Sequence, residues 1–187
     1  MDRRELLKKI ALLTGAAVVG GEFFLTGCKT NNSTPSLFSS ADLSLLDEIA
    51  ETIIPATDTP GAKAAQLGQF MQVMVTDCYT STEQKEFTEG LIAINEYSKQ
   101  LVQKQFMEAS TEERITVLTS LEKIAKNYNQ EKKDGTPSHY YTMMKQLTLW
   151  GFFTSETGMT ETLRHNPVPG KYQGNVPYTK GEKAWSE

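Results

Sequence analysis

Residues 40–62 read SADLSLLDEIAETIIPATDTPGA, and this stretch decides the fold class. Its apolar residues return every three or four positions, which is the period of one buried helix face: Leu45, Leu46, Ile49, Ala50, Ile53 and Ile54. Ser40 is a good N-cap, and Pro55 cannot continue a helix. The residues from Thr57 to Gly61 have the composition of a turn. The stretch therefore predicts a helix that starts at Ser40, stops at Pro55 and is followed by a turn.

Similar patterns predict further helices on both sides of polar breaks. A second helix runs from Ala62 through Cys78, with an apolar stripe of Leu67, Phe70, Met71, Met74, Val75 and Cys78. The place of Cys78 on this stripe predicts a buried, structural thiol. Ser81 and Gln84 resemble a capping box at the start of a third helix, which carries Phe87, Leu91, Ile94, Leu101 and Val102.

Two more helices complete the helical part. Ser110 with Glu113 predicts a capping box for a fourth helix that buries Ile115, Val117, Leu118, Leu121, Ile124 and Tyr128. Thr136 and Pro137 resemble an N-cap and the first residue of a fifth helix, which carries Tyr140, Tyr141, Met144, Leu147, Trp150 and Phe153. No stretch alternates apolar and polar residues for long enough to predict a strand. The sequence therefore predicts an all-α single domain of about five packed helices.

The character of the chain changes near residue 154, where an irregular C-terminal tail rich in glycine and proline begins. Regular structure is interrupted by Gly158, Pro167, Pro169, Gly170, Gly174 and Pro177. A short helical turn is predicted around residues 160–164, and the tail keeps scattered apolar anchors at Leu163, Tyr172, Val176 and Tyr178. A segment of this kind packs either onto its own domain or onto a partner.

The N-terminal segment predicts export. Arg3 and Arg4 precede a mild apolar run at residues 10–19 and resemble a twin-arginine signal, whereas an ordinary secretory signal needs only positive charge there. The run is too short for a retained membrane-spanning helix. Residues 25–28 (LTGC) resemble the lipobox of bacterial lipoproteins, so we expect Cys28 to be lipidated. The expected layout is a signal peptide at 1–27, a flexible tether at 28–36 and a folded domain at 37–187, on an exported lipoprotein that is anchored in the membrane and faces the periplasm.

Charge and cysteine content limit the partners. Removal of residues 1–27 would leave 15 basic and 20 acidic residues, and no long basic run is present, so nucleic-acid binding is not expected. Attachment to a membrane would depend on the lipid anchor. With Cys28 lipidated, Cys78 would be the one remaining thiol, and no intrachain disulfide could form.

Sequence motifs for catalysis are missing, and no catalytic residue, metal ligand or cofactor of its own is predicted. Dinucleotide, phosphate-loop, nucleophile-elbow and paired-cysteine metal motifs are absent, and the cysteine spacing excludes covalent haem attachment. His139 and His165 are interpreted as structural or surface histidines rather than haem ligands. Adjacent acids at Asp47, Glu48 and Glu51 are interpreted as a solvated helix face.

Two motifs resemble gluconate 2-dehydrogenase subunit 3 family proteins. The first is residues 53–62 (IIPATDTPGA), after the first predicted helix. The second joins residues 151–158 (GFFTSETG) to residues 167–174 (PVPGKYQG) and resembles the family's C-terminal signature. Both motifs have the composition of turns rather than of catalytic sites.

The resemblance implies a small, non-catalytic subunit of a membrane-associated sugar or sugar-acid dehydrogenase. In such complexes a flavin-containing large subunit, which carries FAD, oxidises the substrate, and a cytochrome subunit with haem often passes electrons towards quinone. A twin-arginine signal suits a flavoprotein that folds before export and leaves with the small subunit. The residues expected to bind the partner are Gly151, Phe152, Phe153, Thr154, Ser155, Glu156, Gly158, Pro167, Pro169, Gly170, Tyr172 and Gly174.

Two other functions remain open from the sequence. One is an enzyme acting alone, which would need a pocket that gathers His139 or His165 with acids. The other is a stand-alone lipoprotein that binds a small ligand or a component of the cell envelope.

Overall fold

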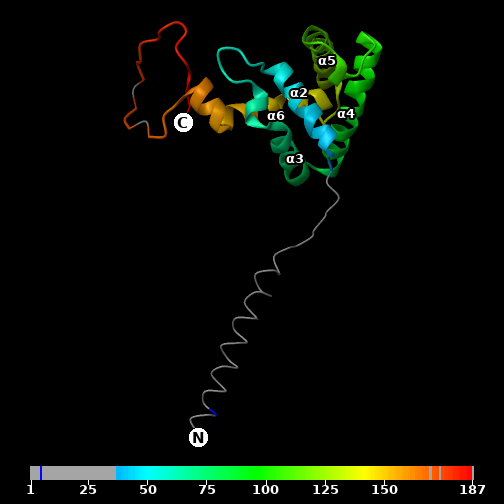
Figure 1. Cartoon of the computed structure of the whole chain (residues 1–187), viewed down its shortest axis with the longest axis horizontal. Helices are drawn as coiled ribbons and strands as arrows, with labels where there is room; N and C mark the ends of the chain where they lie inside the picture. Colours follow the sequence, from blue (N-terminus) through cyan, green and yellow to red (C-terminus); the bar gives the residue numbers. More distant parts are fainter. Residues whose placement is uncertain (1–4, 6–36, 169, 173, 187) are drawn as a thin grey trace. The chain divides into compact units, whose positions relative to one another are not determined.

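A computed structural model describes Glu5 and residues 37–168, 170–172 and 174–186 of the chain (Figure 1). The signal sequence, including Arg3 and Arg4, and the lipidation site Cys28 lie outside the described residues. The body from Leu37 onwards is all-α, as predicted. Its elements, in chain order, are α2 (Ser40–Ile53), η1 (Ala62–Ala65), α3 (Leu67–Cys78), α4 (Ser81–Val102), η2 (Phe106–Glu108), α5 (Thr111–Glu131), α6 (Tyr140–Thr154), η3 (Gly158–Thr162), β1 (Arg164–His165) and β2 (Trp185–Ser186).

Capping boxes start three of the helices, and two of them differ from the prediction by one residue. Ser110 caps α5 with Glu113, as predicted, but α2 is capped by Ser39 with Asp42 and α4 by Thr80 with Glu83. In both shifted cases two adjacent hydroxyl residues compete for the cap position. The one with a carboxylate three residues later is used, because that carboxylate accepts the N-cap N–H in return and favours the positive end of the helix dipole.

The second predicted helix is split. Residues 62–65 form the 3₁₀ turn η1, and Gln66 then adopts a left-handed conformation at φ 50° before α3 begins. Within α3, Leu67, Met71 and Val75 at steps of four face the core. Cys78 is the last residue of α3 and is exposed, so the prediction of a buried thiol is wrong.

The central element is α6, which packs against α2, α3, α4 and α5 (Figure 1). A helix enclosed in this way is apolar on most of its faces, and seven of its residues are buried: Tyr141, Met143, Met144, Leu147, Thr148, Gly151 and Phe152. The outer helices each bury one stripe. Some expected core residues flank those stripes and are exposed instead, namely Leu101 on α4, Ile115 and Ile124 on α5, and Trp150 on α6.

His139, rather than Thr136, caps α6. The Nδ1 atom of His139 accepts a hydrogen bond from the Tyr141 N–H at 3.2 Å. Asn129 fixes this start, because its Oδ1 accepts from the His139 N–H at 3.1 Å and its Nδ2 donates to Thr142 Oγ1 at 2.7 Å. The contact with α5 therefore decides where α6 begins, which local sequence could not reveal.

The acidic residues of α2 are structural, and their interpretation as a solvated face is wrong. Asp47 accepts a hydrogen bond from the Gly68 N–H at 2.7 Å, at the start of α3. Glu51 accepts from the N–H groups of Ala56 at 3.0 Å and Lys63 at 2.8 Å. Glu48 forms ion pairs with Lys63 and Arg114. Together the three carboxylates hold the turn after α2 and the start of α3 against the helical body.

The tail contains two very short strands, although no strand was predicted. Strands β1 and β2 pair in parallel, with Arg164 opposite Trp185 and His165 opposite Ser186. The intervening residues form a loop that leaves the body at η3 and returns to it (Figure 1). No helix in the described part of the chain is long and apolar enough to cross a membrane.

Candidate docking surface

Aromatic side chains lie uncovered at the C-terminal end of α6. Trp150 is 53% exposed and Phe153 is 40% exposed, and they share one face of the helix because they are three residues apart. The Trp150 ring meets the Phe70 ring of α3 edge to face, with centroids 5.9 Å apart. Val73 on α3 is also exposed. We call Phe70, Val73, Trp150 and Phe153 the α3/α6 patch.

Gly151 and Phe152 lie behind this patch, in the core. A Cβ atom at Gly151 would lie 2.5 Å from Phe70 Cδ1, so the missing side chain lets α3 approach α6 within the same chain. Phe152 is fully buried. Both residues were expected to bind the partner, but both are buried and neither is accessible to another chain. They position the patch rather than form it, because the helical period turns positions 151 and 152 inward.

A tight turn after α6 sets the direction of the tail. The Ser155 hydroxyl donates to the Phe152 carbonyl at 2.7 Å and accepts from the Gly158 N–H at 3.0 Å. Gly158 is buried, and a Cβ atom there would collide with the Phe152 carbonyl. Of the expected partner-binding residues in this turn, Thr154 and Glu156 have exposed side chains. Ser155 and Gly158 instead connect α6 to η3.

The loop between the strands is closed at its base. The Arg164 N–H donates to the Ala184 carbonyl at 2.8 Å, and the Asn166 N–H donates to the Ser186 carbonyl at 2.9 Å. The Arg164 guanidinium lies over the Trp185 ring, 3.5 Å from its centroid, and pairs with Glu182. Sequence reasoning did not identify this set, since the partners are about twenty residues apart and follow no known pattern.

The loop itself does not cover the helices. Tyr172 is 96% exposed and Tyr178 is 82% exposed, and Val168 and Val176 are also exposed. Of the expected anchors, Tyr172, Val176 and Tyr178 therefore do not pack onto their own domain, which was one of the two expected alternatives. Other residues expected to bind a partner lie on this loop: Pro167, Gly170, Tyr172 and Gly174 are exposed, and Pro169 lies outside the described residues.

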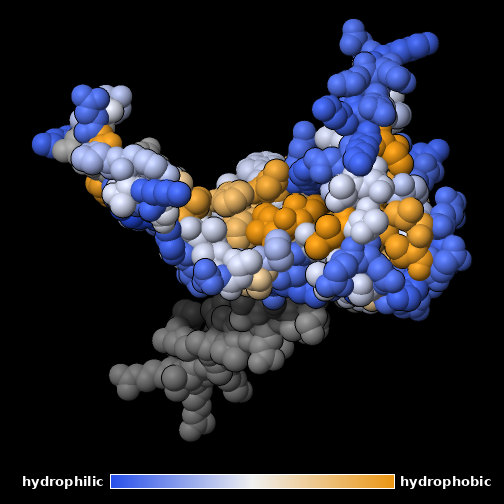
Figure 2. All heavy atoms as spheres, turned by 90° about the horizontal axis from the view of Figure 1, so that it is seen from above, coloured by the Kyte–Doolittle hydropathy of each residue, from blue (hydrophilic) through white to orange (hydrophobic). Residues whose placement is uncertain are grey.

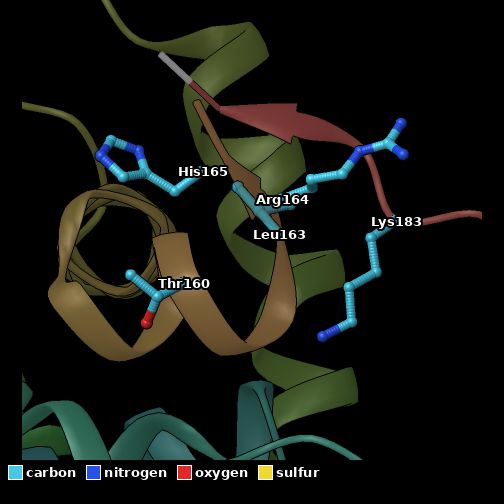
Figure 3. A pocket seen from close by; sticks show the side chains of 5 residues that line it. All are labelled: Thr160, Leu163, Arg164, His165 and Lys183. Atoms are coloured by element: carbon cyan, nitrogen blue, oxygen red, sulfur yellow. The ribbon is translucent and has the colours of Figure 1, made fainter. Parts of the chain in front are cut away.

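A pocket of about 560 Å³ lies beside the base of the loop and is lined by Thr160, Leu163, Arg164, His165 and Lys183 (Figure 3). In Figure 3 the side chains of Arg164 and Lys183 extend to one side of the ribbon, whereas His165 points to the other. The basic groups therefore do not converge on one point. Within the described residues no group of three or more acids, histidines or cysteines could hold a metal ion.

The contacts of His139 indicate a structural role for this residue. Its ring packs against Tyr128 and Tyr140, with centroids 5.4 Å and 4.1 Å away. Burial lowers the pKa of His139, and its Nδ1 atom is engaged in the helix cap. Burial also raises the pKa of Tyr140 and Tyr141, in each case to about 12. These groups stay neutral in the core and belong to the packing of α5 and α6.

Figure 2 shows hydrophobic side chains gathered along one face of the molecule between hydrophilic ends. The family model for gluconate 2-dehydrogenase subunit 3 matches residues 40–170 of the chain. The chain belongs to the gluconate 2-dehydrogenase subunit 3 family. The match runs from α2 through β1 and includes the α3/α6 patch, so the subunit 3 family region covers the whole helical body.

The first motif that resembled the subunit 3 family lies within this matched region, and the second begins within it and extends beyond residue 170. Residues 53–62 connect α2 to η1, and residues 151–158 form the end of α6 and the turn into η3. No curated protein and no solved structure shows significant similarity to the chain.

Proposed function

We propose that this chain is the accessory subunit of a periplasmic, membrane-associated sugar or sugar-acid dehydrogenase, and that it binds, accompanies during export and tethers a flavin-containing catalytic subunit. The family assignment supports a role in a dehydrogenase complex. The catalytic subunit would supply FAD, and a cytochrome subunit with haem would be a further component. This chain would contribute binding surface rather than chemistry.

One observation carries the proposal: aromatic side chains are exposed beside each other at the end of α6, the most enclosed helix of the fold. The Trp150 ring packs edge to face with the Phe70 ring and leaves about half of its surface in solvent. Aromatic residues are enriched among those that dominate binding energy in protein interfaces. A rigid helix holds these rings in place, so little conformational entropy would be lost when a partner covers them.

Co-expression with flavin oxidoreductases from the same genome tests the proposal. Trp150→Ala with Phe153→Ala should weaken binding by about tenfold or more, because aromatic anchors in a desolvated patch contribute on the order of 2 kcal/mol each. Ile115→Ala with Ile124→Ala is the matched control, since it removes two exposed apolar side chains from α5. Unchanged flavoprotein capture by the aromatic variant, or equal loss in both variants, would reject this surface.

Tethering is proposed to depend on Cys28. The LTGC sequence motivates it, and a protein with two acyl chains attaches firmly to a membrane, whereas one chain is marginal. Cys28→Ser should abolish labelling by a fatty-acid analogue and release the protein from the membrane fraction. Labelling that persists in this variant would contradict the assignment of Cys28.

Export together with the folded catalytic subunit is proposed to depend on Arg3 and Arg4. Replacing both by lysine keeps the charge but removes the paired arginines, so the precursor should accumulate in the cytoplasm with its flavoprotein. Normal export of that variant would indicate a general secretory route and would remove the support for joint export.

A further inference from the structure

We infer that the loop between β1 and β2 is a preformed basic arm, held at its base by Arg164, that fits an acidic recess on the catalytic subunit. The inference rests on the proposed function and adds the chemistry of the contact. It assigns Arg164 as a positioning residue, because it fixes the arm without facing the recess itself.

The base of the arm is fixed by several independent contacts. Besides the strand pairing and the Arg164–Trp185 stacking, Lys183 Nζ donates to the Glu161 carbonyl, and Ser186 Oγ donates to the Met159 carbonyl at 3.4 Å. These contacts tie both ends of the loop to η3. Because the loop is already closed in the free protein, its conformational entropy is lost before a partner binds, and this favours binding.

The charge of the arm is opposite to that of the body. Residues 37–163 hold ten basic and eighteen acidic residues, whereas residues 164–187 hold four basic and two acidic ones. Between positions 166 and 181 the charged residues are Lys171 and Lys180, and no acid accompanies them. Lys171 stands next to Tyr172, and Lys180 is two residues after Tyr178. A complementary surface would therefore carry acids around an apolar recess that receives a tyrosine ring.

The arm does not use the acidic body of its own chain as that surface. Lys171, Tyr172, Tyr178 and Lys180 are all exposed, and no described residue between Pro167 and Tyr178 forms a hydrogen bond or ion pair with the helices. An extended loop with uncovered aromatic and basic residues leaves its binding groups available to another molecule.

A catalytic subunit fits these features better than a membrane or a second copy. Two lysines would be attracted only weakly to an anionic membrane, while the acidic body would be repelled. A second copy offers an acidic body, but the arm of one chain on the body of the next makes a head-to-tail contact that continues into open assemblies unless it closes into a ring.

The test measures binding of the full chain to the co-expressed flavin oxidoreductase over a range of salt concentrations. Lys171→Glu with Lys180→Glu should weaken binding by about tenfold or more and abolish the weakening that salt causes in the wild type. Lys123→Glu with Lys133→Glu makes the same change of charge at exposed positions on α5 and just after it, and should change binding less than about twofold. Binding that is equal in the two charge-reversed proteins would overturn the inference.

The role of Arg164 in holding the arm can be measured separately by proteolysis. Arg164→Ala should speed tryptic cleavage after Lys171 and Lys180 and weaken binding, while the thermal unfolding of the body stays the same. Arg164→Lys should restore only part of both effects, because lysine lacks the planar group that stacks on Trp185. Unchanged cleavage in Arg164→Ala would show that Arg164 does not hold the arm.

Further measurements on the same variants distinguish the catalytic subunit from a membrane or a second copy as the partner of the arm. They also separate failure of this inference from failure of the proposed function. Binding of the Cys28→Ser chain to phosphatidylglycerol vesicles that is lost in Lys171→Glu/Lys180→Glu would assign the arm to the membrane, and salt-sensitive self-association lost in that variant would assign it to a second copy. Loss of binding in Trp150→Ala/Phe153→Ala but not in the arm variants would overturn this inference alone. No binding by the wild type would overturn both.

Discussion

Glu48 joins three segments that lie far apart in the sequence. Its carboxylate pairs with Lys63 in η1 and with Arg114 on α5. Arg114 extends the link, because its Nε donates to the Phe106 carbonyl at 3.0 Å and its Nη2 donates to the Met107 carbonyl at 2.8 Å. Glu48 and Arg114 are each only 15% exposed, so the pair is little screened by solvent. One carboxylate thus holds α2, the turn after it and the start of α5 together.

Also at the scale of the residue, we expect His139 to make the free energy of unfolding depend on pH. Burial lowers its pKa below the ordinary 6.5, so around that pH the unfolded chain binds more protons than the folded one. The stability that depends on neutral His139 is fully present above pH 6.5 and is lost as the pH falls through the lowered folded value. Protonation would also remove Nδ1 as acceptor for the Tyr141 N–H.

Urea unfolding between about pH 5 and pH 8 measures this contribution. His139→Asn keeps an N-cap acceptor but does not titrate, so its stability should fall less than that of the wild type in the acidic part of the range. Parallel curves for the two proteins would show that His139 makes no such contribution.

At the scale of the element, α6 serves both the core and the surface. Its first three turns are enclosed by four other helices, and its last turn presents Trp150 and Phe153 to solvent. The change occurs because α3 covers only one side of the end of α6. Gly151 determines how closely α3 approaches, because a Cβ atom at this position would lie 2.5 Å from Phe70 Cδ1.

Gly151→Ala should therefore destabilise the protein, although alanine is the better helix former. The new methyl group would meet the Phe70 ring, and overpacking of this kind costs about 1–3 kcal/mol, against a gain of about 1 kcal/mol from helix propensity. Chemical denaturation measures the change. Phe70→Leu in the same protein should recover part of the loss; a stabilised single variant would show that α3 moves without cost.

At the scale of the whole molecule, the helical body and the arm are separate in their energetics. The core consists of residues from α2 to α6 with Phe38, Ala62 and Phe106, and it contains none of the described residues between Arg164 and Ser186. Tail contacts involve η3 and the strands themselves. The body is thus expected to fold without the arm.

Removal of residues 164–187 tests this separation. Thermal unfolding of the truncated chain should stay within about 2 °C of the wild type, because the arm buries none of the core, while capture of the flavin oxidoreductase should fall. A large drop in the unfolding temperature would instead indicate that the tail stabilises its own domain. The cut leaves η3 intact, since the Leu163 N–H bonds to the Gly158 carbonyl at 2.9 Å.

The sequence by itself determined the all-α class, most helix boundaries and the family, because periodicity, caps and breakers are properties of neighbouring residues. Ser110 with Glu113 and the stop before Pro55 are examples. Only the tertiary structure decided which residues of each apolar helix face are covered by other helices. Trp150 and Cys78 have the spacing of core residues, yet both are exposed, because no helix packs over the end of α6 or of α3 at those positions. The local sequence pattern indicates that one face of a helix is apolar. The arrangement of the other helices decides whether that face is buried or remains free for a partner.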